Sequence, residues 1–371
     1  MSDDRDDPLA RLRAQIAAVD DELLALVARR LDLARQVGEA KRAAGLPVRS
    51  FGTEAEVLAR FRARAAAVGL DESLVERLAH YLIGASVRLQ EETQNAALER
   101  PLAVLIVGGA GKMGRWLARY FLGQGHRVAT LDPAGAVPGC ASARDLAAAL
   151  PLADVVVVAT PLSRGAEVLR EILAARPRAL VADILSLKSH VIEELKGAAA
   201  RGLKVASLHP LFGPDVRTLG GRVLAVLDCG NAAAADEAAG LFADSALTIT
   251  RLPIEAHDVY MQYVLGLSHL VAILFFTTLA RSHRPFDELA LAASTTFLKQ
   301  ARTAAEVARE NPALYYEIQK LNRHSKRLFA LVKEGLGEIE KAALADRADA
   351  FVRLMEAGRA YFPETLPVEL E

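Results

Sequence analysis

A glycine-rich turn that lies a hundred residues into the chain constrains the fold most strongly. Residues 104–114 read V-L-I-V-G-G-A-G-K-M-G, a buried strand that runs into Gly109-x-Gly111-x-x-Gly114. In such a strand–turn–helix unit the glycines permit a tight turn, a close approach of backbone to a pyrophosphate, and packing of helix on strand. A unit of this kind usually opens its domain, so the segment before it indicates a separate domain.

The segment before the turn has the apolar spacing of α-helices. Apolar residues recur at helical intervals from Leu9 to Ala44, and the glycine and proline of residues 45–47 end the pattern. A second helix is predicted over residues 54–68 and a third from after Asp71, whose side chain can cap its first turn, to about residue 97. In a monomer the first helix exposes an apolar stripe along most of its length. The sequence therefore predicts a dimer that buries this stripe.

The order of the segments predicts three domains. Residues 101–252 alternate strands with helices, and their continuous valine-rich runs are typical of parallel strands buried on both faces. Residues 253–371 return to a helical pattern. We therefore expect a multidomain chain with an all-α domain over residues 1–97, an α/β Rossmann-type domain over 101–252, and an all-α domain over 253–371 that pairs two subunits.

Composition excludes several classes of partner. The net charge is −1 and no long basic block occurs, which argues against nucleic acid. The longest apolar stretch, residues 261–280, is interrupted by polar side chains and is predicted to be a buried helix rather than a membrane span. The acidic start is the reverse of a signal peptide, which predicts a cytoplasmic protein. The two cysteines match no metal spacing.

The turn and the strand after it predict a dinucleotide site for NAD. Asp132 ends the second strand, 18 residues (132 − 114) past Gly114, where a carboxylate grips a ribose 2′-hydroxyl and repels a 2′-phosphate. Thr160-Pro161 ends a later strand, at the edge where a nicotinamide ring would lie, although proline there also simply ends a strand. The predicted cofactor residues are Gly109, Gly111, Lys112, Met113, Gly114, Asp132, Thr160 and Pro161.

A second cluster of chemistry follows the cofactor half. Residues 183–188 (D-I-L-S-L-K) and 207–215 (S-L-H-P-L-F-G-P-D) each come at the end of a predicted strand, where open α/β sheets bind ligands. His209 is expected in a loop after its strand, facing the cleft, where it can accept a hydroxyl proton while hydride leaves the same carbon. On the helix from Glu255, His257 is predicted to be structural, and His269 is either structural or part of the site.

These motifs, in this order, resemble a known family. G-G-x-G-x-M-G, D-x-x-S-x-K, L-H-P-x-F-G-P-D and H-D followed by a helical histidine are similar to prephenate dehydrogenase, and the leading helices resemble the intertwined, all-helical chorismate mutase. The whole chain resembles the bifunctional chorismate mutase–prephenate dehydrogenases, or T-proteins, of tyrosine biosynthesis. The resemblance implies chorismate and prephenate as substrates, NAD as cofactor, no metal, a homodimer, and tyrosine as an inhibitor whose site no residue locates.

For the dehydrogenase, the resemblance implies roles for several of these side chains. His209 would hydrogen-bond the ring hydroxyl of the substrate, Ser186 would support that hydroxyl and the histidine, and His269 would lie near the substrate. Asp215 ends the histidine motif and is placed at the substrate too. An arginine on a late helix would bind the side-chain carboxylate, with Arg302 the first candidate and Lys299 the second.

For the mutase, the resemblance places site residues along the helices. The rearrangement is pericyclic, so catalysis consists of holding the folded conformer and stabilising charge on the ether oxygen. Arg30 would hold a carboxylate, while Lys41 and Gln90 would donate to the ether oxygen. Arg13 lies 17 residues (30 − 13) before Arg30, or ~25 Å along a helix, so it would serve a partner's site. The full set is Arg13, Arg30, Lys41, Glu54, Ser86 and Gln90.

One departure from the family keeps alternatives open. The family has an arginine immediately before the site glutamate and an aspartate a few residues earlier, where this chain has Thr53 and Ser50. Arg49 is close enough in sequence to substitute. The chain is therefore a two-activity enzyme or a dehydrogenase whose helical module serves dimerisation or regulation. The histidine motif argues against a third reading, a β-hydroxyacid dehydrogenase with an unrelated helical module. Prephenate, arogenate and a 4-amino analogue stay open as substrates.

Overall fold

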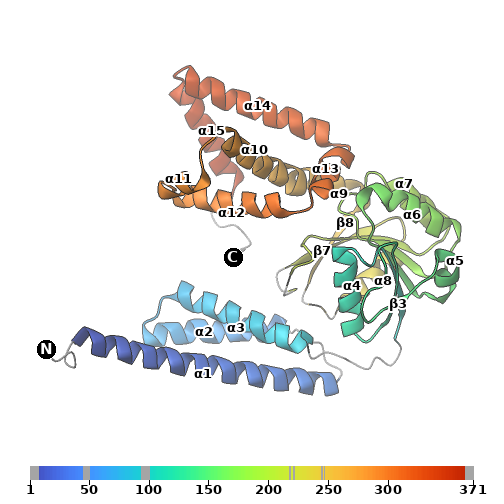
Figure 1. The fold of residues 1–371 in the computed structure, drawn as a ribbon, viewed down its shortest axis with the longest axis horizontal. Coiled ribbons are helices and arrows are strands. Elements are labelled where there is room, and N and C mark those ends of the chain that lie inside the picture. Colours follow the sequence, from blue (N-terminus) through green and yellow to red (C-terminus); the bar gives the residue numbers. More distant parts are fainter. Residues whose placement is uncertain are drawn as a thin grey trace. The chain divides into compact units, whose positions relative to one another are not determined.

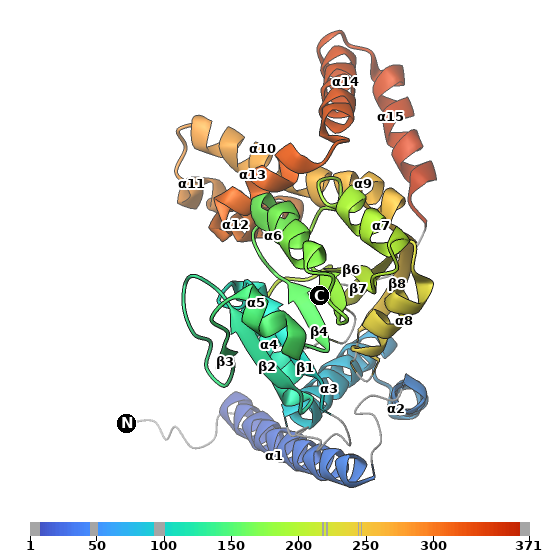
Figure 2. The ribbon, with the colours of Figure 1, turned by 90° about the vertical axis from the view of Figure 1, so that its right-hand side faces the viewer.

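The structure is a computed structural model that describes residues 8–44, 51–92, 101–216, 219, 222–243, 245 and 247–363 (Figures 1 and 2). The chain divides into two compact units. The first comprises Met1–Ser186 and Val191–Ile254, and the second comprises Leu187–His190 and Glu255–Glu371. The chain thus enters the second unit for the four residues 187–190 and then returns to the first.

The N-terminal part of the first unit is a group of three helices, α1 (Pro8–Ala43), α2 (Phe51–Val68) and α3 (Glu72–Glu92). α3 packs against both α1 and α2, and Figure 1 shows the three side by side. The predicted cap of α3 is present, because the Leu74 amide donates to Asp71 Oδ1 at 3.0 Å. α2 begins at Phe51, three residues before the predicted start. α1 is one continuous helix and leaves an apolar series exposed, namely Leu12, Ile16, Val19, Leu23, Leu26, Leu33 and Val37.

The remainder of the first unit is built on an eight-stranded sheet, in the order β3-β2-β1-β4-β5-β6-β7-β8 among the described residues. Neighbours from β3 to β6 are parallel, which confirms the Rossmann-type prediction. The strands are β1 (Ala103–Val107), β2 (Arg127–Leu131), β3 (Ala141–Ser142), β4 (Val155–Val158), β5 (Leu180–Asp183), β6 (Val205–Pro210), β7 (Val223–Asp228) and β8 (Thr248–Pro253).

Two strands depart from the all-parallel expectation. β7 runs antiparallel to β6, and β8, which the sequence reading did not identify, runs parallel to β7. The connection from β6 to β7 contains no helix among its described residues. A parallel return needs a crossover, usually helical, whereas an antiparallel one does not. The expectation of continuously buried strands holds at the centre of the sheet, where Val155–Val158 are all buried.

Short helices connect and cover the strands. α4 (Lys112–Gly123) packs against β1 and β2 through Leu117 and Phe121, which are fully buried. The aromatic rings of Trp116, Tyr120 and Phe242 extend this core. The other connecting helices are α5 (Leu146–Ala149), a 3₁₀ turn (Leu150–Leu152), α6 (Leu162–Ala174), α7 (Ile192–Ala200) and α8 (Ala232–Gly240).

The second unit is helical, as predicted. α9 (Ile254–Met261) continues through a π-helical turn (Gln262–Leu267) into α10 (Ser268–Arg281). Together, residues 254–281 are long and apolar enough to cross a membrane by length and composition, and 11% of the most apolar 18-residue window is buried within the chain. The prediction that this stretch is buried is therefore wrong for the single chain. The later helices are α11 (Phe286–Leu291), α12 (Thr295–Arg309), α13 (Pro312–Leu321), α14 (Ser325–Leu344) and α15 (Ala348–Tyr361).

Candidate active sites

The glycine turn joins β1 to α4, and three of its glycines have no room for a Cβ. Gly108 has a φ of +90°, and a Cβ added there would lie 2.6 Å from the carbonyl oxygen of Ala159. A Cβ on Gly109 would meet the Thr130 side chain at 2.5 Å, and one on Gly114 would meet the Gly108 carbonyl oxygen at 2.2 Å. The turn therefore requires Gly108 as well as Gly109 and Gly114 of the predicted motif. The sequence reading quoted the G-G doublet but gave Gly108 no role.

The start of α4 presents backbone amides at this turn. Gly111 is the N-cap residue and contributes no side-chain hydrogen bond, and Lys112 and Met113 begin the helix. A helix N-terminus without a side-chain cap is suited to bind an anion, because its first amides and the helix dipole both favour negative charge. The predicted phosphate residues thus gather at one turn.

Asp132, directly after β2, lies against the same turn. Its Oδ2 accepts the amide of Ala110 at 2.9 Å, and its Oδ1 accepts the amide of Ala134 at 2.8 Å. The carboxylate therefore joins the tip of the glycine turn to the loop after β2. This is the place that the sequence predicted for a group that contacts a ribose.

Thr160 and Pro161 follow β4, next to Gly108. A Cβ on Gly108 would lie 2.8 Å from the Thr160 amide nitrogen, and Pro161 is the N-cap residue of α6. The Thr160 Oγ1 is buried and makes no hydrogen bond with the described residues. A turn with glycines at positions 108, 109 and 111, an uncapped helix start, an acid beside it and an unbonded buried hydroxyl fit a dinucleotide.

His209 and Ser186 lie at the ends of neighbouring strands. His209 is the fifth residue of β6, is 3% exposed and pairs with Ala225 of β7, so the prediction that it lies in a loop is wrong. The antiparallel partner extends the strand through Pro210. Ser186 is partly exposed in the loop after β5, where the Leu185 amide donates to Asp183 Oδ2 at 3.0 Å. β5 and β6 are adjacent, so both residues follow the same edge of the sheet.

The remaining dehydrogenase candidates are divided between the units. Asp215 is exposed in the loop after β6. His269, on α10, contacts the ring of Tyr315, with centroids 4.2 Å apart and the two planes tilted by 35°, and burial lowers the pKa of His269 to about 4. Lys299 and Arg302 are exposed on α12, which packs against α10. The first unit thus holds Asp215, and the second holds the histidine and both candidate cations.

In the N-terminal helices the structure brings four of the predicted residues toward one another. Arg30 Nη1 on α1 donates to Ser86 Oγ on α3 at 2.7 Å and to the Leu82 carbonyl at 2.8 Å. Gln90, one turn beyond Ser86, is buried against Gly38, where a Cβ would lie 2.8 Å from Gln90 Cγ. Lys41 is partly buried one turn beyond Gly38 on α1. α1 and α3 thus form one polar strip.

Two cations lie near one another beside this strip. Burial lowers the pKa of Arg30, and the positive charge of Arg60, on α2, lowers it further. Arg60 is exposed and lies seven residues, or two helical turns, beyond Thr53. Sequence reasoning did not single out Arg60, because only the packing of α2 shows that it is near Arg30.

The other mutase candidates are less completely placed. Arg13 is exposed near the start of α1, and the unbroken helix puts it ~25 Å from Arg30, at 1.5 Å per residue. Glu54 lies on α2, but its side chain and that of Thr53 are outside the described residues. Arg49 and Ser50 are also outside the described residues.

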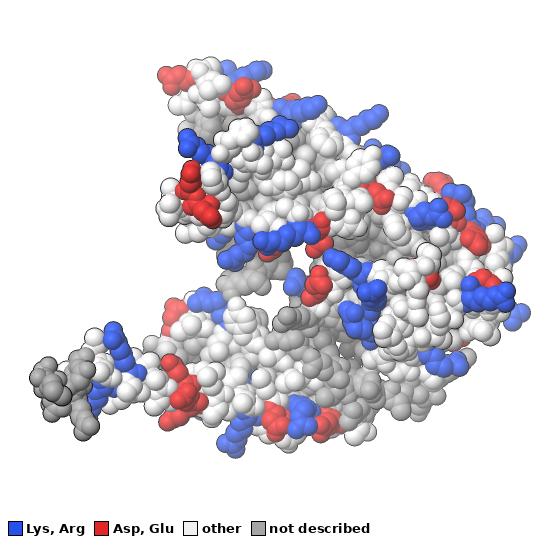
Figure 3. Space-filling view, in the orientation of Figure 1, with Lys and Arg blue, Asp and Glu red and all other residues white. Residues whose placement is uncertain are grey.

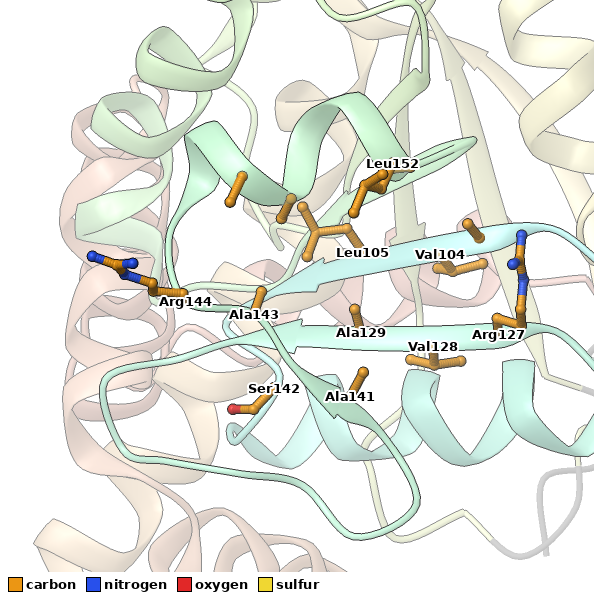
Figure 4. Close-up of a pocket in the computed structure, with 14 residues that line it drawn as sticks. Val104, Leu105, Arg127, Val128, Ala129, Ala141, Ser142, Ala143, Arg144 and Leu152 are labelled. Atoms are coloured by element: carbon orange, nitrogen blue, oxygen red, sulfur yellow. The ribbon is translucent and has the colours of Figure 1, made fainter.

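A separate pocket of about 530 Å³ lies on the sheet away from the glycine turn. In Figure 4, Leu105 of β1 faces Leu152 of the short helical segment, and Arg127 and Arg144 mark opposite ends of the pocket. The pocket uses the N-terminal halves of β1 and β2, whereas the glycine turn follows the other end of β1. Figure 3 shows basic and acidic side chains interspersed over the described part of one face.

Three family models match the chain in series. Residues 12–91 match chorismate mutase type II, residues 137–221 match the nucleotide-binding domain of prephenate dehydrogenase, and residues 253–357 match its dimerization domain. The T-protein of Enterobacter agglomerans is 28% identical over 92% of this chain and 89% of its own length. The 4-amino-4-deoxyprephenate dehydrogenase of Streptomyces pristinaespiralis is 28% identical over 70% of this chain and 91% of its own.

Solved structures support the same fold. Prephenate dehydrogenase from A. aeolicus, in complex with hydroxyphenyl propionate and NAD+, has a TM-score of 0.58 at 17% identity, covering 71% of this chain and 98% of that one. Arogenate dehydrogenase from Synechocystis has a TM-score of 0.54 at 17% identity, covering 70% and 98%. With the mutase match ahead of both dehydrogenase domains, the chain belongs to the bifunctional chorismate mutase–prephenate dehydrogenases, the NAD-dependent enzymes of tyrosine biosynthesis.

Proposed function

We propose that the two activities of this bifunctional enzyme are carried by two separate sets of side chains. One set lies on α1–α3 and acts on chorismate. The other set, which acts on prephenate, comprises side chains that lie near the ends of β5 and β6 in the first unit and side chains on α10 and α12 in the second. The observation that carries the proposal is the Arg30–Ser86 hydrogen bond with Gln90 beside it, in a chain that also has the glycine turn and Asp132.

For the mutase, the side chains hold a dianion in a folded conformer. Chorismate has two carboxylates and an ether oxygen, and its rearrangement needs no nucleophile. Arg30, already fixed by Ser86, binds one carboxylate through its planar fork. Lys41 and Gln90 donate to the ether oxygen, where negative charge develops, and Glu54 adds a donor there when protonated.

Arg60 contributes part of the positive charge that Thr53 does not supply. It is close enough to Arg30 to depress that residue's pKa, so the field of both guanidiniums acts in one region. A bound carboxylate would relieve the repulsion between the two cations. This arrangement favours an active mutase over a module that only dimerises.

For the dehydrogenase, His209 and Ser186 act on the ring hydroxyl. When bound, NAD supplies the acceptor for hydride from the hydroxyl-bearing ring carbon. His209 hydrogen-bonds the hydroxyl and takes its proton, and Ser186 holds the same oxygen. The bond to the ring carboxylate then breaks, carbon dioxide leaves, and its electron pair makes the ring aromatic. The proton held by His209 returns to the phenolic oxygen of 4-hydroxyphenylpyruvate.

Side chains of the second unit bind the part of the substrate that carries the side-chain carboxylate. Arg302, with Lys299 one turn away on α12, binds the side-chain carboxylate. His269, neutral because burial lowers its pKa to about 4, offers a hydrogen bond without a charge. Asp215 contacts the substrate from the loop after β6. Prephenate is the proposed substrate; relatives named for arogenate and for 4-amino-4-deoxyprephenate make these the comparison substrates.

The protein acts as a homodimer in the cytoplasm. The match to a dimerization domain, the exposed apolar series of α1 and the exposed apolar surface of residues 254–281 all support a second copy as partner. Tyrosine, the end product of the route, is proposed as an inhibitor. Steady-state assays with and without tyrosine test this part of the proposal.

A paired assay on the purified chain tests the assignment of the side chains. Prephenate formation from chorismate and NADH formation from prephenate plus NAD are followed on the same preparation. Arg30→Ala is expected to lower the mutase kcat at least ~100-fold and to leave NADH formation unchanged. His209→Asn is expected to lower NADH formation by ~10²–10⁴-fold and to leave the mutase unchanged. Loss of both activities in either variant would contradict two separate sets.

Thr53 supports a second candidate, a dehydrogenase with a weak mutase. In that case the wild-type chain converts chorismate slowly, and Thr53→Arg raises the mutase kcat at least ~10-fold by restoring a cation. A wild-type mutase that gains nothing from Thr53→Arg but is lost in Arg60→Ala supports the contribution of Arg60 instead.

A further inference from the structure

Asp258, on α9, is a buried carboxylate that the two reactions above do not use. It is 2% exposed and belongs to the second unit. Within that unit it lies against residues 187–190, the four-residue segment that directly follows Ser186 in the chain. A buried carboxylate needs hydrogen-bond or ion-pair partners, because burying a charge without partners is very unfavourable.

The carboxylate is surrounded by hydrogen-bond donors from that segment. The Lys188 amide donates to Oδ1 at 2.9 Å and to Oδ2 at 3.1 Å. The Ser189 amide donates to Oδ2 at 2.6 Å, and the Ser189 hydroxyl donates to the same oxygen. Asp258 therefore holds two successive residues of the segment by their backbone as well as by a side chain.

Other contacts hold Asp258 itself. His257 is fully buried and its Nδ1 lies 2.7 Å from Asp258 Oδ1. Asn322, also buried, donates from Nδ2 to the Asp258 carbonyl at 2.9 Å, which ties α9 to the residue that follows α13. Burial alone would raise the pKa of Asp258. The hydrogen bonds from His257, Ser189 and Lys188 outweigh it and hold the pKa well below its ordinary value, so the bonds are charge-assisted and strong.

We propose that Asp258 is a positioning residue of the dehydrogenase, which holds the amides of Lys188 and Ser189 and thereby sets where Ser186 presents its hydroxyl to the substrate. The inference rests on the role proposed above for Ser186. Only Leu187 lies between Ser186 and Lys188, the first residue whose amide Asp258 holds, so Ser186 can move little while these hydrogen bonds are intact. A misplacement of ~1 Å at a reacting group can lower a rate ~10²-fold.

The first test compares kinetic constants of Asp258→Asn and the wild-type holoenzyme. Asparagine keeps the shape and removes the charge and one acceptor. The kcat for NADH formation is expected to fall ~10–100-fold, while the KM for NAD changes less than about two-fold, because the residues proposed to hold NAD lie on other elements. Mutase activity of the same chain stays unchanged. Unchanged kcat, or an equal loss of NAD affinity, would overturn the proposal.

A double-mutant cycle separates positioning from general damage to the fold. If Asp258 acts through Ser186, then Asp258→Asn in a Ser186→Ala background lowers kcat less than about two-fold. If the two effects multiply in full, Asp258 acts by another route and the proposal fails. The Ser186→Ala variant alone tests the earlier assignment: an unchanged kcat there overturns the role of Ser186, and with it this inference, whatever Asp258→Asn does.

Two further variants keep the test decisive. Ser189→Ala removes only the hydroxyl donor and is expected to lower kcat a few-fold. Its effect is also expected to be smaller in a Ser186→Ala background. If Asp258→Asn does not fold, Ser189→Ala replaces it in the double-mutant cycle. Asp228→Asn is the matched control, because Asp228 also accepts two amides, from Gly230 and Asn231, at 2.8 Å each. It pairs with Ala206, at the opposite end of β6 from the site. A loss of kcat in Asp228→Asn equal to that in Asp258→Asn would overturn the proposal.

Discussion

Single residues decide whether the cofactor turn can form, and Gly108 is the most demanding of them. It combines a φ of +90° with a carbonyl oxygen 2.6 Å from the position of a Cβ. Gly108→Ala is therefore expected to raise the Kd for NAD at least ~10-fold and to lower the free energy of unfolding by about 2–4 kcal/mol. Tryptophan-fluorescence titration with NAD and urea unfolding measure the two quantities.

Gly202 provides the control for this prediction. Its φ is +81°, but beyond its two chain neighbours no heavy atom in the described part of the chain lies within 4 Å of a Cβ built there. Gly202→Ala introduces the strain of a positive φ without a steric collision. Its free energy of unfolding is therefore expected to fall by about 1–2 kcal/mol, and its Kd for NAD is expected to stay unchanged. Equal NAD affinities in the two variants would show that the collision at Gly108 has no consequence for the cofactor.

His269, the histidine that contacts Tyr315 in the second unit, makes the stability of the fold depend on pH. The ordinary pKa of His269 is 6.5 and burial lowers it to about 4. Above pH 6.5 the ring is neutral in both the folded and unfolded states. As pH falls from 6.5 toward 4, the unfolded chain binds a proton that the folded chain excludes, so stability decreases across that window. Between about pH 7 and pH 5 the loss is on the order of 1 kcal/mol, because partial exposure screens the charge.

Chemical unfolding of the wild type and of His269→Gln measures this effect. The difference between the two free energies of unfolding is expected to shrink as pH falls through the window and to stay constant above it. A difference that does not vary between pH 7 and pH 5 would mean that the ring is protonated as readily in the fold as in water.

Between elements, the close approach of α1 and α3 organises the mutase residues. A Cβ at Gly38 would lie 2.8 Å from Gln90 Cγ and 3.2 Å from its backbone Cα. Glycine to alanine in a helix ordinarily stabilises by about 1 kcal/mol. At Gly38 the same substitution is expected to lower the free energy of unfolding by about 1–3 kcal/mol, because the new Cβ collides with Gln90. The mutase kcat is expected to fall at least ~10-fold because Gln90 moves.

The comparison variant for Gly38 is Gly84→Ala on α3. Apart from the backbone of α3 itself, no heavy atom of the described residues lies within 4 Å of a Cβ there, so the ordinary helical gain applies and mutase activity is unchanged. Thermal inactivation of chorismate turnover gives the order of stability directly. If Gly38→Ala proves as stable as Gly84→Ala, α1 and α3 can accommodate a Cβ at position 38, and the predicted collision with Gln90 does not occur.

Local patterns predicted the elements well, whereas contacts between distant segments escaped the sequence. The cap at Asp71, the strand before Gly108 and the acid Asp132 each follow from neighbouring residues. The direction of β7 does not, because nothing local distinguishes a parallel from an antiparallel strand, and His209 was placed in a loop for that reason. Asp258 and Lys188 are 70 positions apart, so no spacing rule connects them.

At the scale of the whole molecule, the apolar surfaces that one chain leaves exposed indicate a partner. Residues 261–280 were predicted to be buried because of their composition, yet few of them are buried in the single chain, and Tyr263, Val264, Val271 and Leu274 are exposed. Residues 253–357 match a dimerization domain, and we propose that a second copy covers this apolar surface. Hydrophobic periodicity predicts an apolar contact surface but does not say which chain covers it.

The separation of Arg13 and Arg30 on one helix predicts active sites shared between subunits. About 25 Å separates them at 1.5 Å per residue, too far for one small substrate within a chain. Arg13→Ala and Arg30→Ala homodimers are each expected to lack mutase activity. A dimer of the two variants contains one site with both arginines intact and one with neither. After unfolding and refolding an equimolar mixture, about half of the dimers are mixed, so about a quarter of wild-type mutase activity returns. NADH formation by each variant is the control. If the mixture stays inactive while mixed dimers are detected by mass spectrometry, Arg13 has no part in the partner's site.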